Sequence, residues 1–430
     1  MIMRRSIIYI IAICVIYAAM TVYMCFFPRS TYSELEQREL AKVPQLNMPD
    51  LMSGKFTSAV SSWFSDTEPG RDRFMKLSME VKSARKIVLN NEEAITFHAP
   101  EPEEVEEVAN EDTSYVNENA KLAHSGIIIV GTGDRTRALM GFKGYHGKGR
   151  YVQAVNAFAR EFAPDSVQVY CMLIPSAACF YTPDYAKKWT KDQRTCIDSA
   201  FKCLDDNVKK IHLVDPLKAH SAEPIYLRTD HHWSPLGAYY ASCVFAKTAG
   251  VPFKSLDEYD RKVVKRYVGS MYGYSKDISV KKAPEDFVYY VPKDSSYTTE
   301  YTRYKINSSY KIEAEYPTEK GNFFYKFPDG SSNAYCTFMG SDGRITKVTT
   351  SVNNGRRLLI LKDSFGNPIP SYLFSSFEQI FVVDFRYFNR SIKKMVRDNK
   401  VTDILFANAL SLSISGDRAG NCYLRMINAD

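Results

Sequence analysis

The sequence lacks the cysteine and histidine spacings that build metal sites and disulfide frameworks. It contains nine cysteines and seven histidines, but no CxxC, HxH or HExxH pattern. Cys14 and Cys25 lie in an apolar N-terminal run, and several of the seven other cysteines lie in further apolar runs. We therefore expect buried free thiols rather than a disulfide framework, and we predict neither a metal nor a cofactor.

Positive charge is absent from residues 87–120, which contain ten carboxylates and no lysine or arginine. Because the whole chain has a formal net charge of +7, the remainder carries +17. Such a surface favours anionic partners such as acidic glycans, wall polymers or lipid head groups, although a solvated lysine-rich surface is the alternative. No nucleic-acid-binding motif is present, so nucleic acid is not a predicted partner.

The N-terminus carries the longest hydrophobic run of the chain. Arg4 and Arg5 precede an uncharged stretch over 6–27, and about 20 helical residues at about 1.5 Å each cross a hydrocarbon core. No small-residue cleavage site follows, so residues 1–28 are predicted to be a signal anchor, with a cleaved signal peptide as the alternative. The arginines predict a cytoplasmic N-terminus, which makes the chain a single-pass membrane protein with an extracytoplasmic C-terminal domain.

The rest of the chain divides by composition and periodicity into three parts. Residues 29–98 have apolar positions at helical spacing, as in Phe56, Val60 and Phe64, and predict a helical stalk. Residues 99–120 are rich in glutamate and poor in apolar side chains, which predicts a flexible acidic linker. Residues 121–430 are predicted to form the main domain.

Apolar runs alternate with helix-like stretches in this main domain, which predicts an α/β sandwich with a mostly parallel sheet. The expected strands are 126–130, 167–174, 358–361, 380–383 and 403–406, and the expected helices include 151–162 and 236–247. The segment over about 261–350 differs, because it is rich in tyrosine and lysine. We expect a β-rich insertion whose tyrosines stack on sugar rings, or are ordinary strand residues.

Two short motifs contain the parts of a nucleophilic serine site. The first is Thr229-Asp230-His231-His232-Trp233, and the second is Leu361-Lys362-Asp363-Ser364-Phe365-Gly366-Asn367. A serine hydroxyl needs an imidazole to take its proton and a carboxylate to orient that imidazole. In an extended segment, Asp230 and His232 would share one face while His231 faces the other, so we assign the base to His232. A metal site on Asp230, His231 and His232 is the alternative from another class.

These motifs resemble those of the DHHW family, bacterial envelope proteins related to the SGNH-like alginate O-acetyltransferases. The resemblance rests on residues 228–240, 361–367 and 383–388, and extends upstream to 36–38, 54–56 and 66–71. It implies an SGNH-hydrolase-like three-layer sandwich in permuted order, because the acid and base precede the serine. By this resemblance Ser364, His232 and Asp230 are the catalytic triad.

The resemblance also implies candidates for binding the oxyanion or the substrate, namely Asn408, Arg386 and His231. Asn408 follows an expected strand, and a plain strand-end residue is the alternative. The backbone amide of Ser364 is a second expected oxyanion donor. This chain departs from the simplest SGNH pattern, because Lys362-Asp363 stands where a glycine usually precedes the serine.

The implied activity is O-acylation of a cell-surface polysaccharide, most simply O-acetylation, through an acyl-serine intermediate. The implied partners are a glycan acceptor, the bacterial cell membrane and a polytopic membrane protein that delivers the acyl group. A carbohydrate esterase of the same fold would use the same residues with water as the acceptor. A catalytically inactive glycan-binding envelope protein is the other alternative.

Overall fold

The computed structural model describes residues 13–15, 17–23, 27–33, 38–74, 77, 120–123, 126–306, 312–340 and 342–429. The chain forms two compact units, Met1–Glu111 and Asp112–Asp430, so the boundary falls inside the predicted acidic linker. That linker lies outside the described residues, except for Ala120, and so does much of the predicted signal anchor. Among the described residues, no helix has both the length and the apolar character needed to span a membrane.

In the described part of the first unit, two helices, α2 and α3, and two short strands have defined bounds. Helix α2 (Met48–Met52) starts at an asparagine cap and continues, after a turn, into α3 (Lys55–Asp66). Strands β1 (Tyr32–Ser33) and β2 (Arg38–Glu39) pair antiparallel. The periodicity that predicted a helix through Phe56, Val60 and Phe64 is therefore confirmed.

A nine-stranded sheet organises the second unit. Its main path runs β11-β10-β13-β15-β14-β16-β6-β7, and β12 pairs with β10 off this path. The strands are β6 (Gln168–Ile174), β7 (Val208–Ile211), β10 (Tyr297–Ile306), β11 (Ile312–Glu315), β12 (Glu319–Gly321), β13 (Arg344–Thr350), β14 (Arg357–Lys362), β15 (Gln379–Asp384) and β16 (Asp403–Ala409). The neighbours from β15 to β7 are parallel, whereas β13, β10, β11 and β12 pair antiparallel.

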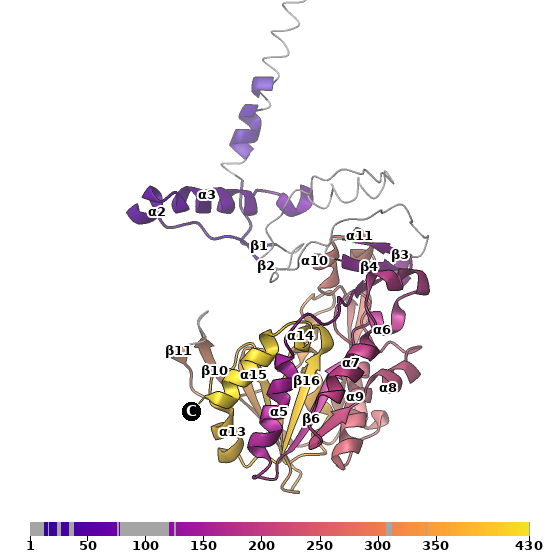
Figure 1. Ribbon diagram of the computed structural model, residues 1–430. Helices are drawn as coiled ribbons and strands as arrows, with labels where there is room; N and C mark the ends of the chain where they lie inside the picture. Colours follow the sequence, from indigo (N-terminus) through magenta and orange to yellow (C-terminus); the bar gives the residue numbers. More distant parts are fainter. Residues whose placement is uncertain are drawn as a thin grey trace, which may run out of the picture. The chain divides into compact units, whose positions relative to one another are not determined.

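Helices pack against both faces of this sheet, as the α/β sandwich predicted from the sequence requires. Along β14, Leu358 and Ile360 pack into one apolar cluster, whereas Leu359 and Leu361 pack into the other, as strand alternation requires. Figure 1 shows α5 and α15 lying over strands β16 and β6. The buried side chains of these two helices belong to the second cluster. The helices are α5 (Arg150–Phe162), α6 (Ala178–Tyr181), α7 (Gln193–Lys202), α8 (Val214–Ala219), α9 (Pro235–Ala249), α12 (Ile369–Tyr372), α13 (Ile392–Asp398), α14 (Leu410–Ser413) and α15 (Arg418–Asn428).

The tyrosine-rich segment is β-rich, as predicted, but it is not a separate appendage. Its strands β8 (Tyr259–Tyr267) and β9 (Glu285–Pro292) form a two-stranded sheet, with α10 (Met271–Ser275) and α11 (Ile278–Lys281) between them. Strands β10 and β13, however, extend the central sheet through the pairing of β13 with β15. The second half of the segment is therefore part of the main fold.

Two further expectations need correction. The expected strand over 126–130 forms as β4 (Ile127–Val130), but it pairs with β3 (Ala120–Leu122) and β5 (Arg137–Met140) in a small antiparallel sheet of its own. The structure describes all seven cysteines beyond the N-terminal run; none of them is in a disulfide, and only Cys171 and Cys422 are buried. Most of these cysteines are therefore not core residues, in contrast to the expectation of buried thiols.

Candidate active site

Residues 226–233 form a closed loop rather than an extended strand. Tyr226 and Trp233 form an antiparallel bridge, the Leu227 amide donates to the His232 carbonyl (3.3 Å), and Ser234 then caps α9. The alternation expected of an extended segment therefore does not apply, and the prediction that His231 faces away from His232 is wrong. Their ring centroids lie 3.7 Å apart.

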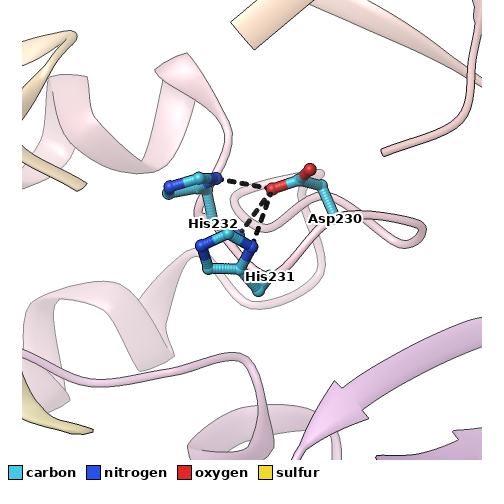
Figure 2. A group of neighbouring side chains, drawn as sticks. All are labelled: Asp230, His231 and His232. Atoms are coloured by element: carbon cyan, nitrogen blue, oxygen red, sulfur yellow. Dashed lines mark hydrogen bonds and ion pairs between the residues drawn. The ribbon is translucent and has the colours of Figure 1, made fainter. Parts of the chain in front are cut away.

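The structure brings Asp230, His232 and Ser364 into one hydrogen-bonded chain. His232 Nδ1 lies 2.6 Å from Asp230 Oδ1, and His232 Nε2 lies 2.7 Å from Ser364 Oγ. Because an ionised carboxylate only accepts, the Nδ1 proton faces Asp230 and Nε2 is free to accept from the serine. Figure 2 shows one carboxylate oxygen of Asp230 directed at both histidine rings. This order of contacts is the one that a serine nucleophile requires.

Protein donors surround the Asp230 carboxylate, which is 4% exposed. Its Oδ2 accepts from the Tyr267 hydroxyl (2.8 Å) and the Ser270 amide (2.9 Å), while Oδ1 accepts from the His232 amide (3.0 Å) and ring. Burial alone would raise the pKa of Asp230, but the two imidazoles and the Ser270 amide outweigh it and hold that pKa well below its ordinary value. Gly269 is required here, since a Cβ would collide with this carboxylate.

Glu285 of β9 fixes the backbone of this loop directly before Asp230. Its carboxylate accepts from the backbone amides of Arg228 (2.8 Å) and Thr229 (2.6 Å) and from the Thr229 hydroxyl (2.7 Å). Burial raises the pKa of Glu285 above its ordinary value. The strand of the tyrosine-rich segment therefore holds the acid of the triad in place.

Ser364 begins a single 3-10 turn (η6, Ser364–Gly366) directly after β14. Asp363 caps this turn through Phe365 N (3.0 Å) and also accepts from Ala409 N of the neighbouring strand (2.7 Å). Trp233 Nε1 donates to the Phe365 carbonyl (2.8 Å), so the tryptophan of the first motif holds the backbone of the second. In the described part of the chain, the Ser364 amide has no acceptor, and it remains available to an oxyanion.

Asp363 gives a pH-dependent prediction. Burial raises its pKa to about 6, despite its two backbone donors, and its unfolded value is about 3.9. An acid whose pKa is raised by folding stabilises the fold fully below the unfolded pKa and loses this contribution as pH rises through the folded pKa. The advantage of the wild type over Asp363→Asn in free energy of unfolding should therefore grow by on the order of 2 kcal/mol from pH 7 to pH 4.

Urea unfolding of both proteins at matched pH values measures this difference. The wild type and the variant share every other titrating group, so shared contributions cancel. The variant also loses one side-chain oxygen that accepts a hydrogen bond from a backbone amide, but this loss does not depend on pH. An equal difference in free energy of unfolding at pH 4 and pH 7 would contradict the raised pKa.

His231 lies against the outer face of the His232 ring and is 22% exposed in its side chain. Its Nδ1 is 2.6 Å from Ser270 Oγ. Burial, and then the neighbouring His232, lower the pKa of His231 to about 3, so it is neutral at pH 7. Ligand atoms of Asp230, His231 and His232 lie within 4.8 Å of one another. Both nitrogens of His232 and both oxygens of Asp230 are already hydrogen-bonded within the protein, so this set does not fit a metal ion.

Asn408 and Arg386, the other two candidates, occupy different environments. Asn408 is fully buried in β16, and its Oδ1 accepts from the hydroxyls of Tyr151 (2.8 Å) and Tyr423 (3.1 Å). Its Nδ2 has no partner among the described residues, and its role as an oxyanion donor stays a prediction. Arg386 is clamped by Asp384 through Nε (2.9 Å) and Nη2 (2.7 Å), and its Nη2 also contacts Asp342 (2.9 Å).

A family model described as DHHW protein matches residues 36–96 and 82–383. The chain belongs to the DHHW family. A crystal structure of a DHHW family protein from Eubacterium siraeum is similar, with 33% identity and a TM-score of 0.63 over 72% of this chain and 99% of that one.

Two further solved structures are similar to this DHHW protein at lower identity. PatB1 of Bacillus cereus has 21% identity and a TM-score of 0.53, over 68% of this chain and 99% of that one. The O-acetyltransferase domain of Pseudomonas putida AlgJ has 11% identity and a TM-score of 0.34, over 73% and 94% of the chains. No curated protein matches in sequence. The likeness to PatB1 concerns the mixed α/β fold alone.

The supporting residues of this site were not found from sequence. Tyr267, Ser270, Glu285 and Tyr335 all come from the tyrosine-rich segment, and each contacts a triad residue or the loop that carries it. The enrichment in tyrosine is the available signal, but it equally fits a sugar-stacking surface or ordinary strand composition.

Proposed function

We propose that this DHHW protein is a serine O-acyltransferase that works through an acyl-Ser364 intermediate. The observation that carries the proposal is the continuous contact from Ser364 Oγ through His232 to Asp230, with distances of 2.7 and 2.6 Å. A further support is the buried, ionised state of Asp230, which suits it to stabilise an imidazolium.

The residues divide the reaction into two matched steps. In the first, His232 Nε2 takes the hydroxyl proton while Ser364 Oγ bonds to the acyl carbon, and the leaving group departs with the proton from the imidazolium. The amide of Ser364 donates to the oxygen that becomes negative. In the second step an acceptor hydroxyl gives its proton to His232 and attacks the acyl carbon. Ser364 Oγ leaves and recovers that proton.

The acyl group and acceptor that we propose are acetyl and a cell-surface polysaccharide, in keeping with the family resemblance. The fold is then an SGNH-like sandwich in permuted order. We also propose that the chain is a single-pass protein of the bacterial cell membrane, with its C-terminal domain outside the cytoplasm. A polytopic membrane partner would supply acetyl groups from the other side of that membrane.

Labelling with a sulfonyl fluoride tests the activated serine. One solved structure of Bacillus cereus PatB1 carries a sulfonyl adduct, and this protein has the same fold. We expect full-length protein to gain one sulfonyl group on Ser364, as measured by intact mass and peptide mapping. Ser364→Ala should gain none. Cys336 and the other exposed cysteines provide the internal control, because their modification would not depend on Ser364.

The acceptor is tested separately with an activated acetyl ester and a neutral or acidic oligosaccharide. Transfer predicts an acetylated oligosaccharide that appears faster than free acetate. Release of acetate alone, at an unchanged rate with oligosaccharide present, would make the protein an esterase. Absence of both labelling and turnover in the folded wild type would contradict the proposed function and favour a glycan-binding protein.

A further inference from the structure

The imidazole of His232 lies between two flat rings. On one face is Tyr335, with centroids 3.9 Å apart and an interplanar angle of 10°, and on the other is His231, at 3.7 Å and 37°. Tyr335 belongs to a 3-10 turn, η5 (Ala334–Thr337), far from the DHHW motif in sequence. The His232 ring is therefore enclosed on both faces, by a sequence neighbour and by a distant tyrosine.

These ring contacts restrain a movement that the hydrogen bonds do not. The bonds from His232 to Asp230 and Ser364 both lie at ring nitrogens, so they fix the imidazole within its own plane. Rotation of the ring about the line through these two nitrogens would keep both distances but turn the N–H group and the lone pair away from their partners, and the flat rings block this rotation. They also exclude water from the faces of the ring, and the negative face of a tyrosine ring favours a protonated imidazole.

Tyr335 also contacts the nucleophile. Its hydroxyl donates to the Ser364 carbonyl (3.2 Å), and its side chain is held by an edge contact with Phe287, at 6.1 Å and 70°. Burial raises the pKa of Tyr335 well above its ordinary value, so the hydroxyl keeps its proton at neutral pH. One side chain thus touches the ring of the base and the backbone of the nucleophile.

We propose that Tyr335 is a positioning residue of the triad, which aligns His232 with Ser364 by stacking on the base and bonding the serine carbonyl. This inference rests on the proposed function. It adds a contact with the base and the nucleophile to the contacts that Tyr267 and Ser270 of the same segment make with Asp230. The flat face of the side chain is the essential property, and the hydroxyl adds to it.

Substitutions that separate the flat face from the hydroxyl test this role. Tyr335→Phe keeps the ring, whereas Tyr335→Leu and Tyr335→Met fill the space without one. Tyr289→Leu is the matched control, because Tyr289 is a buried tyrosine of the same segment that packs on Phe287, Phe324 and Phe338 instead of the triad. The measurements are the rate of Ser364 labelling by a sulfonyl fluoride, kcat and KM for an activated acetyl ester, and the melting temperature.

We expect Tyr335→Leu and Tyr335→Met to lower kcat and the labelling rate on the order of 100-fold with little change in KM, since misalignment of reacting groups has this effect. Tyr335→Phe should lose less than about tenfold, the value of one hydrogen bond. Tyr289→Leu should lose stability but keep kcat. Two non-aromatic variants are made so that the failure of one to fold leaves the comparison with phenylalanine intact.

The outcomes distinguish this inference from the proposed function. A wild type that is not labelled on Ser364 contradicts the proposed function. A labelled wild type, together with leucine and methionine variants that react at its rate, overturns only the positioning role of Tyr335. Equal losses in the phenylalanine and leucine variants would also overturn it, because stacking would then contribute nothing.

Discussion

His232→Ala should abolish acyl-serine formation, whereas His231→Ala should lose much less activity. His232 alone bridges Asp230 and Ser364, and loss of a triad member costs about three to four orders of magnitude in rate. His231 contacts only one face of the base, and an aromatic contact of this kind contributes up to roughly tenfold. Asp230→Asn should be severely impaired as well, because the carboxylate sets the tautomer of His232.

The measurement is acetyl-ester cleavage or transfer by full-length variants, with folding of each checked by thermal melting. Ser364→Ala sets the level of complete loss. A folded His232→Ala protein with near-normal turnover would remove His232 as the base. A folded His231→Ala protein as inactive as Ser364→Ala would show that His231 does more than pack against the His232 ring.

The triad was predictable because its chemistry needs particular residue types, and two short motifs contained them. The geometry of the first motif was not predictable from alternation. The bridge between Tyr226 and Trp233 closes the segment into a loop, and the Asp230 side chain bonds the His232 amide. A local hydrogen bond of this kind replaces the extended conformation that the spacing rule assumes.

The parallel strands and their covering helices were predictable because buried strands are continuous apolar runs. The edge of the sheet was not, since β10 and β13 consist largely of threonine, tyrosine and charged residues, and their pairing is set by distant partners. The supporting residues Tyr335 and Glu285 were unpredictable for the same reason, because only tertiary contacts bring them to the triad.

Lys362 shows most clearly what the sequence does not reveal. Lys362 lies two residues before the nucleophile, and its side chain is only 2% exposed. Lysines are rarely buried unless they are paired with an acidic group. Its Nζ contacts Asp342 (2.7 Å) and Asp384 (3.2 Å), and Arg386 contacts the same two carboxylates. Two cations and two anions thus balance one another beside the serine turn.

Lys362→Met should therefore lower the free energy of unfolding by about 3 to 5 kcal/mol at pH 7, because it leaves the buried Asp384 and the half-buried Asp342 with one cation. Burial alone would lower the pKa of Lys362, but the two carboxylates outweigh burial and raise the pKa of this lysine. Burial alone would raise the pKa of Asp342, but Lys362 and Arg386 outweigh burial and lower the pKa of this aspartate. Stability from the raised lysine pKa is lost at high pH, and stability from the lowered aspartate pKa is lost at low pH. The effect of the substitution should consequently be largest between about pH 4 and pH 10.

Urea unfolding with two companion variants tests whether the buried charge balance, rather than the loss of a lysine, causes this destabilisation. Lys187→Met removes a lysine from an exposed pair with Asp184 at 2.6 Å, where both side chains are mostly solvated, and should leave the unfolding midpoint unchanged. Lys362→Met combined with Asp384→Asn restores neutrality, with Arg386 facing Asp342, and should recover part of the lost stability. If Lys362→Met were as stable as Lys187→Met, or if the double variant were less stable than Lys362→Met alone, the four charges would not act as a balanced buried network.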